Sequence, residues 1–127
     1  MIGYVTLGTN DLARGAQFYD ALLAEIGAKR FMEAAGTFVA WEVGPGTPSL
    51  ALTVPFNGEA ATVGNGTMVA LALKSPAEVD AFHKKALELG GQNEGDPGPR
   101  ESDQFYAAYF RDLDGNKLNC FCMKPSN

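Results

Sequence analysis

The chain has 127 residues, of which 46% are apolar and 20% charged, as in soluble globular proteins. Its net charge of −5 and its pI near 4.7 argue against a nucleic-acid-binding protein, because such proteins neutralise phosphates with Lys and Arg. No apolar run approaches the ~18 residues of a membrane span, and no signal segment opens the chain. We therefore expect a cytoplasmic protein with no nucleic-acid and no membrane partner.

The first half of the chain predicts one strand, one helix and three further strands. Residues 2–8 alternate in polarity and are rich in β-formers, which indicates a strand. Thr9-Asn10-Asp11 then provides a helix cap, and apolar residues at helical spacing from Leu12 to Ile26 predict an amphipathic helix that ends near Gly27. The three later strands, separated by turns rich in glycine and proline, are expected over residues 28–33, 37–43 and 49–54.

The second half repeats this order after a polar, glycine-rich connector at residues 57–66. A strand is expected over 67–73, and a helix begins at the capping box Ser75-Pro76-Ala77-Glu78 and ends at Gly90-Gly91. Residues 92–104 are polar, so a strand is only weakly indicated there. The closing hairpin is predicted from strands at 105–111 and 117–123, with Asp114-Gly115 expected to supply the positive-φ residues of its turn.

The two halves match at a fixed offset of 64 residues, as from Tyr4 to Met68. Strand, cap, helix and terminal glycine all recur in register, which indicates an internal duplication. The predicted organisation is a single domain over 1–127, with module one at 1–56, the connector at 57–66 and module two at 67–127.

The cysteines and the single histidine offer little chemistry. Cys120 and Cys122 lie two residues apart on one face of a strand, so they are poorly placed for a disulfide, and no second cysteine pair exists to complete a metal site. We expect two buried thiols packed against a helix. His83 lies mid-helix beside the buried stripe and is expected to be a satisfied or a surface histidine. Ser/His/Asp and Cys/His catalytic arrangements have no support, and the catalytic residues stay unknown.

Three segments carry a family resemblance: residues 5–12 with Phe18-Tyr19, residues 64–68, and Asp112-Leu-Asp-Gly-Asn-Lys117. They resemble the vicinal oxygen chelate superfamily, which includes glyoxalase I, bleomycin-resistance proteins and extradiol dioxygenases. The third segment is similar to the family's D-P-D-G-N hairpin, with Leu113 in place of proline. The resemblance implies an α+β fold in which two βαβββ modules pair into one curled mixed sheet around an open cleft, with the helices on the outer face. It also implies a homodimer, whose partner chain completes the cleft in several relatives.

Enzymes of this superfamily bind a divalent metal through His or Gln and Glu side chains, and the matching positions here differ. Tyr4 and Met68 stand at the positions on the two opening strands, Asn119 stands where relatives carry Glu after the turn, and Ala51 or a neighbour takes the remaining position. Hard divalent ions need carboxylate or imidazole ligands. We therefore expect no metal and no other cofactor.

By the facing of strands in that family, the residues of the cleft are expected to include Tyr4, Thr6, Ala51, Thr53, Met68, Ala70, Asn119 and Phe121. Trp41, Arg100 and Tyr109 are further candidates. Arg100 belongs to the polar, proline-containing stretch 95–104, which is typical of lids and binding loops. The mixture of aromatic, small and polar residues suits a ligand pocket, but the same side chains could fill the cleft as a second core.

The leading hypothesis is a metal-free protein that binds an unknown small molecule, of the glyoxalase/bleomycin-resistance type. The alternative is a glyoxalase- or dioxygenase-like metal-dependent lyase or oxygenase with a degenerate metal site. A third reading keeps only a structural role, with the cleft closed into core.

Overall fold

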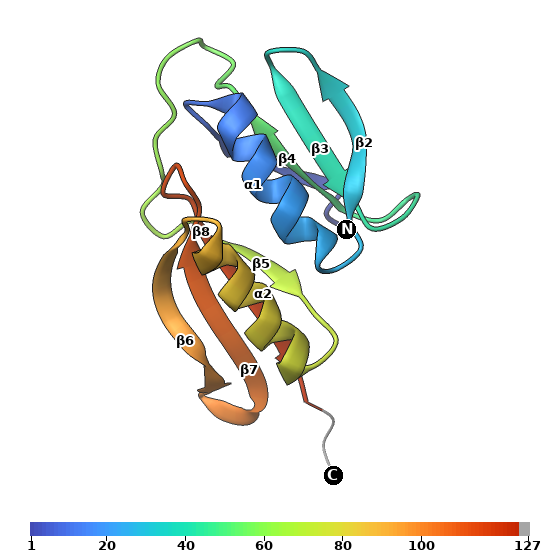
Figure 1. Cartoon of the computed structure of the whole chain (residues 1–127), viewed down its shortest axis with the longest axis vertical. Coiled ribbons are helices and arrows are strands. Elements are labelled where there is room, and N and C mark those ends of the chain that lie inside the picture. Colours follow the sequence, from blue (N-terminus) through green and yellow to red (C-terminus); the bar gives the residue numbers. More distant parts are fainter. Residues whose placement is uncertain (125–127) are drawn as a thin grey trace.

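The computed structural model describes residues 1–124 as two successive βαβββ modules (Figure 1). Residues 125–127, which the predicted second module includes, lie outside the described part. The elements of the first module are β1 (Tyr4–Gly8), α1 (Leu12–Ala24), β2 (Lys29–Ala34), β3 (Phe38–Glu42) and β4 (Ser49–Thr53). Those of the second are β5 (Val69–Ala72), α2 (Pro76–Glu88), β6 (Gln92–Arg100), β7 (Ser102–Arg111) and β8 (Lys117–Met123).

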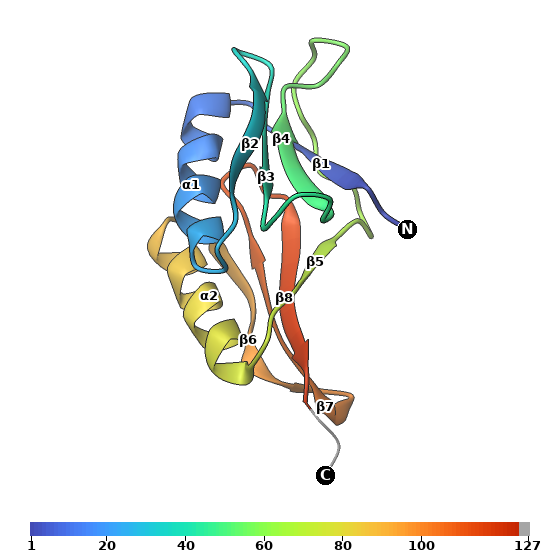
Figure 2. The ribbon, with the colours of Figure 1, turned by 90° about the vertical axis from the view of Figure 1, so that its right-hand side faces the viewer.

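Each module forms its own four-stranded mixed sheet, in the orders β1-β4-β3-β2 and β5-β8-β7-β6. The first strand of each module pairs in parallel with the last, and the other neighbours are antiparallel. The predicted α+β class with two βαβββ modules is confirmed. The two sheets are not hydrogen-bonded to each other, so β1 and β5 each end a sheet with one unpaired edge. Both helices lie on the same side of the sheets (Figure 2).

The helices begin where the sequence places their caps. The Asp11 side chain accepts a hydrogen bond from the Arg14 amide at 3.1 Å, and Ser75 accepts one from Glu78 at 3.1 Å. One continuous core lies between helices and sheets; its fully buried side chains include Leu22, Leu52, Phe82, Phe110 and Leu118. Burial of each such side chain is worth about 1.5–3 kcal/mol.

The prediction of a lid or binding loop over 95–104 is wrong. Those residues continue β6 and begin β7, and the two strands pair from Gln92–Arg111 to Arg100–Ser102 with several register shifts. The prolines fit because β6 is an edge strand, where an N–H need not reach a neighbour. The polar composition of residues 92–100 indicates a strand only weakly, because β6 forms through its pairing with the apolar β7.

The turn before β8 also differs from its prediction. Only Gly115 has a positive φ, at 89°; Asp114 does not. The loop runs from Asp112 to Asn116 and is wound around the Asp112 carboxylate, which accepts hydrogen bonds from the backbone amides of Asp114 and Asn116, both at 2.9 Å. The side chain of the first turn residue thus sets the loop.

The cysteines are free and buried, as predicted. Cys120 packs against α2, with its Sγ 3.9 Å from the Val79 carbonyl oxygen, and burial raises the pKa of its thiol to about 12. His83 is a satisfied histidine, since its Nε2 lies 3.0 Å from Asn93 Oδ1 and 3.2 Å from the Tyr109 carbonyl oxygen. Within residues 1–124, no helix is long and apolar enough to span a membrane.

Candidate functional site

Contacts with the helices fix which way the strands face. The Trp41 indole donates to Asp20 of α1 at 2.9 Å, and the Tyr106 hydroxyl donates to Asp80 of α2 at 2.7 Å, a bond that raises the Tyr106 pKa. Because strand side chains alternate, the neighbours of these residues point to the other side. We call that second side, turned away from α1 and α2, the open face.

The open face carries most of the predicted cleft residues, divided between the two sheets. On the first sheet they are Tyr4, Thr6, Ala51 and Thr53, and on the second Met68 beside β5, Ala70, Tyr109, Asn119 and Phe121. Trp41 is the exception, because it lies on the helix side, 2% exposed, against the ring of Tyr19. The sequence had not resolved whether this residue points toward or away from the helices.

Arg100 lies on the second sheet and is held there by its own strand. Its guanidinium donates to the carbonyl oxygens of Asp96, Gly98 and Pro99. It also stacks over Tyr109, with 5.5 Å from its Cζ to the ring centroid. Most of its hydrogen-bonding capacity therefore serves the β6–β7 hairpin.

A buried polar cluster joins the two modules at one end, and we call it the clasp: Tyr19, Asp112 and Asn116. Oδ2 of Asp112 accepts from the Tyr19 hydroxyl at 2.6 Å and from Asn116 Nδ2 at 2.9 Å. The same Nδ2 donates to the Gly8 carbonyl oxygen at 2.9 Å, at the end of β1. Burial and then the Asp112 charge raise the pKa of Tyr19 well above its ordinary value.

The clasp extends to the start of α1 and to the connector. The Asn10 amide donates to Asp114 Oδ1 at 2.9 Å, and the Asn10 side chain exchanges two hydrogen bonds with the backbone of Ala61. No buried side-chain nitrogen or oxygen in residues 1–124 lacks a partner. The hairpin signature of the sequence thus locks module two onto module one.

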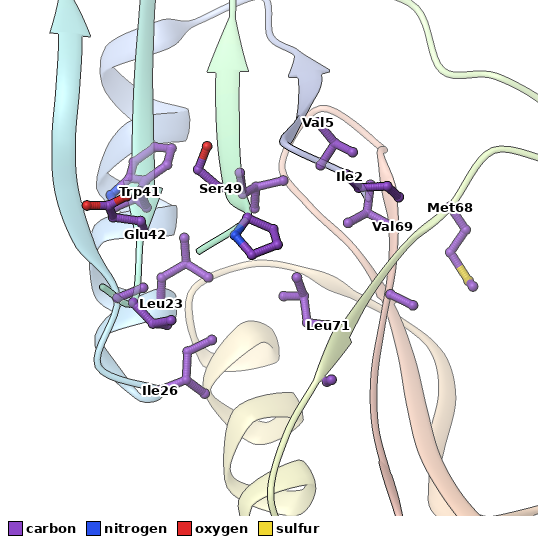
Figure 3. Close-up of a pocket in the computed structure, with 16 residues that line it drawn as sticks. Ile2, Val5, Leu23, Ile26, Trp41, Glu42, Ser49, Met68, Val69 and Leu71 are labelled. Carbon is purple, nitrogen blue, oxygen red and sulfur yellow. The ribbon is translucent and has the colours of Figure 1, made fainter. Parts of the chain in front are cut away.

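An apolar pocket of about 580 Å³ lies between the modules, beside the edge strands β1 and β5 (Figure 3). We call it the seam pocket. Leu23 of α1 and Ile26, which follows the end of that helix, form one wall, and Val69 and Leu71 of β5 form the other. Glu42 and Ser49 add carboxylate and hydroxyl groups. Its volume and apolar lining are those of small-molecule sites.

The seam pocket takes in only Met68, Ala70 and Trp41 of the predicted cleft residues. Most of its lining was missed, because Val5, Leu50, Val69 and Leu71 occupy helix-facing positions that predict ordinary core. The separation of the modules leaves Val5, Val69 and Leu71 half-buried. The short β5, four residues with two small alanines, is the one sequence signal of an incompletely covered edge.

Comparison with known proteins agrees with this geometry. The family model described as Glyoxalase/Bleomycin resistance protein/Dioxygenase superfamily matches residues 1–120. The chain belongs to this superfamily. A glyoxalase/bleomycin resistance protein from Albidiferax ferrireducens T118 is 38% identical, with a TM-score of 0.87 over 98% of this chain and 99% of that one.

Other solved structures are less similar. A hypothetical protein from S. aureus is 27% identical, with a TM-score of 0.72 and 96% of each chain covered. A lactoylglutathione lyase from Agrobacterium tumefaciens is 21% identical, with a TM-score of 0.71 over 96% of this chain and 92% of that one, a likeness that extends to the fold. No curated protein matches the chain.

The residues at the superfamily's metal positions do not fit a divalent ion. Tyr4 offers a neutral phenol, Met68 a soft thioether and Ala51 no donor atom. Asn119 is 1% exposed, and its Nδ2 donates to the Ala108 carbonyl oxygen at 3.2 Å. Across residues 1–124, no group of three His, Cys, Asp or Glu side chains is placed to hold a metal.

Proposed function

We propose that this superfamily member is a metal-independent small-molecule binding protein and that its ligand occupies the seam pocket. The observation that carries the proposal is the pocket itself, about 580 Å³ and largely apolar between two modules that the clasp holds together. The donor set at Tyr4, Met68 and Asn119 supports the metal-independent part, because these side chains suit contact with an organic molecule better than coordination of a hard ion.

We further propose that the protein works as a homodimer. β1 and β5 each present an unpaired backbone edge, and an exposed edge is a surface at which a second chain can pair or pack. The large side chains beside these edges are exposed, 69% for Tyr4 and 41% for Met68. Light scattering after size exclusion should give twice the chain mass; the mass of a single chain at micromolar concentration would contradict the dimer.

The binding proposal is tested with a neutral apolar fluorophore, N-phenyl-1-naphthylamine, titrated with the intact protein. We expect saturable binding that Leu71→Trp abolishes, because the larger side chain fills the seam pocket. Phe31→Trp is the matched control, since Phe31 lies exposed on β2 outside the pocket lining and its replacement should leave binding unchanged. Absence of binding, or equal binding by Leu71→Trp, would overturn the proposal.

The metal-independent part has its own test. Zn²⁺, Ni²⁺, Mn²⁺ or Fe²⁺ should produce neither a saturable thermal shift nor turnover of methylglyoxal with a thiol or of catechols. Turnover that depends on any of these ions would overturn this part and favour a metal-dependent lyase or oxygenase with an unconventional ligand set.

A further inference from the structure

A second pocket, of about 520 Å³, lies where the connector passes the ends of β7 and β8. Two cations line it, Arg111 and Lys117, which face each other as a register pair of the antiparallel strands. Asn65 and Thr67 of the connector add an amide and a hydroxyl. Met68 lines both this pocket and the seam pocket, so the two spaces adjoin at that side chain.

The two cations differ in how far they are already engaged. Arg111 is held by Glu94, with 2.7 Å between Nε and Oε1, and by the Gly115 carbonyl oxygen at 3.0 Å from Nη1. The hydrogen bond from Arg111, and the charges of Arg111 and Lys117, lower the pKa of Glu94. The Lys117 ammonium forms no hydrogen bond or ion pair within residues 1–124, and its Nζ lies 5.5 Å from the Tyr109 ring centroid. An ammonium thus remains available to a ligand.

The charged side chains of the pocket lining are both cations, Arg111 and Lys117, in a chain whose net charge is −5. The nearby carboxylates lie outside the lining and have partners of their own: Glu94 pairs with Arg111, Asp112 belongs to the clasp, and Asp114 accepts from the Asn10 amide. A cationic hollow in an otherwise acidic protein attracts anions selectively, and a charge-assisted hydrogen bond is about twice as strong as a neutral one. The positioned guanidinium and the free ammonium supply donors for a carboxylate or a phosphate.

The open face of the second sheet becomes more apolar with distance from Arg111 and Lys117. The next register pair is Tyr109 with Asn119, then Ala107 with Phe121, then Phe105 with Met123. The rings of Phe105 and Phe121 are in contact at 5.4 Å between centroids. One end of the module is therefore cationic and the remainder of the face is largely apolar, with the seam pocket alongside.

We propose that the ligand is an amphiphilic organic anion, with its carboxylate or phosphate at Lys117 and Arg111 and its apolar body in the seam pocket. This inference rests on the proposed small-molecule function and assigns the ligand's chemical class. Arg111 is the fixed donor, and Lys117 reorients to pair with the anionic group.

The test measures displacement of N-phenyl-1-naphthylamine from the intact protein by 1-octanol, octanoate and octyl phosphate. One charge-assisted contact predicts that octanoate or octyl phosphate binds about tenfold more tightly than 1-octanol. Whichever anion binds more tightly identifies the head group. Lys117→Met should remove this advantage and leave 1-octanol unaffected, whereas Lys117→Arg should retain it. Lys84→Met, at an exposed lysine of α2, should change nothing.

The outcomes separate this inference from the proposed function. If 1-octanol binds and Leu71→Trp blocks it, but the anions bind no more tightly or Lys117→Met leaves their advantage intact, the anion site is wrong and the seam pocket stands. If none of the probes binds to the unaltered protein, both proposals fail. Loss of the anion advantage in Lys117→Met and its recovery in Lys117→Arg would support the site.

Discussion

The two modules contact each other differently at the clasp and at the seam pocket. At the clasp, the buried side chains of Tyr19 on α1 and Asn116 in the turn both donate to the Asp112 carboxylate, at 2.6 and 2.9 Å, and Tyr19 is 1% exposed. At the seam pocket, apolar side chains from β1, α1 and β5 face a space of about 580 Å³ that they do not fill. The same chain closes one end of the junction with polar groups and leaves the other end open with apolar ones.

This difference separates the contacts that hold the modules together from the proposed ligand site. Asp112 and Asn116 of the turn, which match the hairpin signature, connect the modules through Tyr19 and Gly8, and removing any partner would leave a buried polar group unpaired. The seam pocket depends on shape and apolar area, which many side-chain sets supply. A superfamily with one junction can therefore serve different ligands, and four predictions test the contrast.

The largest effect is expected from Asp112→Ala. The change leaves the Tyr19 hydroxyl, the Asn116 amide and two backbone N–H groups without their acceptor, so the free energy of unfolding should fall by about 3–5 kcal/mol. Chemical denaturation measures the loss, with Asp103→Ala at an exposed position as the control. A loss below about 1 kcal/mol would show that the clasp does not hold the modules.

Truncation of a leucine compares the closed core with the seam pocket directly. Leu52→Ala, at a side chain 1% exposed, should lower the free energy of unfolding by about 2–5 kcal/mol. Leu71→Ala should lower it by less than about 1.5 kcal/mol, because this side chain is half-buried and already borders a pocket. Equal losses in parallel denaturation curves would mean that the seam is packed like the core.

Tyr19→Phe isolates one hydrogen bond of the clasp. The ring stays in place against Phe18 and Trp41, but the Asp112 carboxylate loses one of its donors. We expect the free energy of unfolding to fall by about 1–3 kcal/mol, less than for Asp112→Ala because the Asn116 amide and the backbone donors remain. An unchanged or increased free energy of unfolding would mean that the 112–116 turn stabilises the clasp without the Tyr19 hydrogen bond.

The smallest effect concerns alkaline pH. Tyr19 has a raised pKa in the folded state, so above the unfolded-state pKa of about 10 the unfolded chain releases a proton that the folded chain retains. The contribution of Tyr19 to stability is therefore fully present below about pH 10 and is lost as pH rises beyond it. Cys120 adds a similar loss from about pH 8.5 upward. Denaturation midpoints at pH 8 to 11 should fall less steeply in Tyr19→Phe; an unchanged slope would contradict this origin.

Local signals in the sequence determined much of the fold. Both helix caps, the order of strands and helices and the internal duplication follow from residue spacing and turn chemistry, which act over a few neighbouring positions. The facing of strands in the superfamily that the sequence resembles, combined with strand parity, placed Tyr4, Asn119 and Phe121 on the face away from the helices. It could have placed Lys117 there too, since this residue lies two positions before Asn119 on the same strand.

Tertiary structure decided what depends on distant partners. β6 exists because β7 lies beside it, and the side that Trp41 faces follows from Asp20 on α1. The role of the hairpin signature also emerged only in three dimensions: Asp112 and Tyr19 are 93 positions apart in sequence, and no local pattern links them. The seam pocket likewise depends on the tertiary structure. Its helix-facing side chains predict a packed core from the sequence, but the spacing of the two modules leaves them bordering a pocket. Local preferences thus built the two modules, and long-range packing determined where they close and where they stay open.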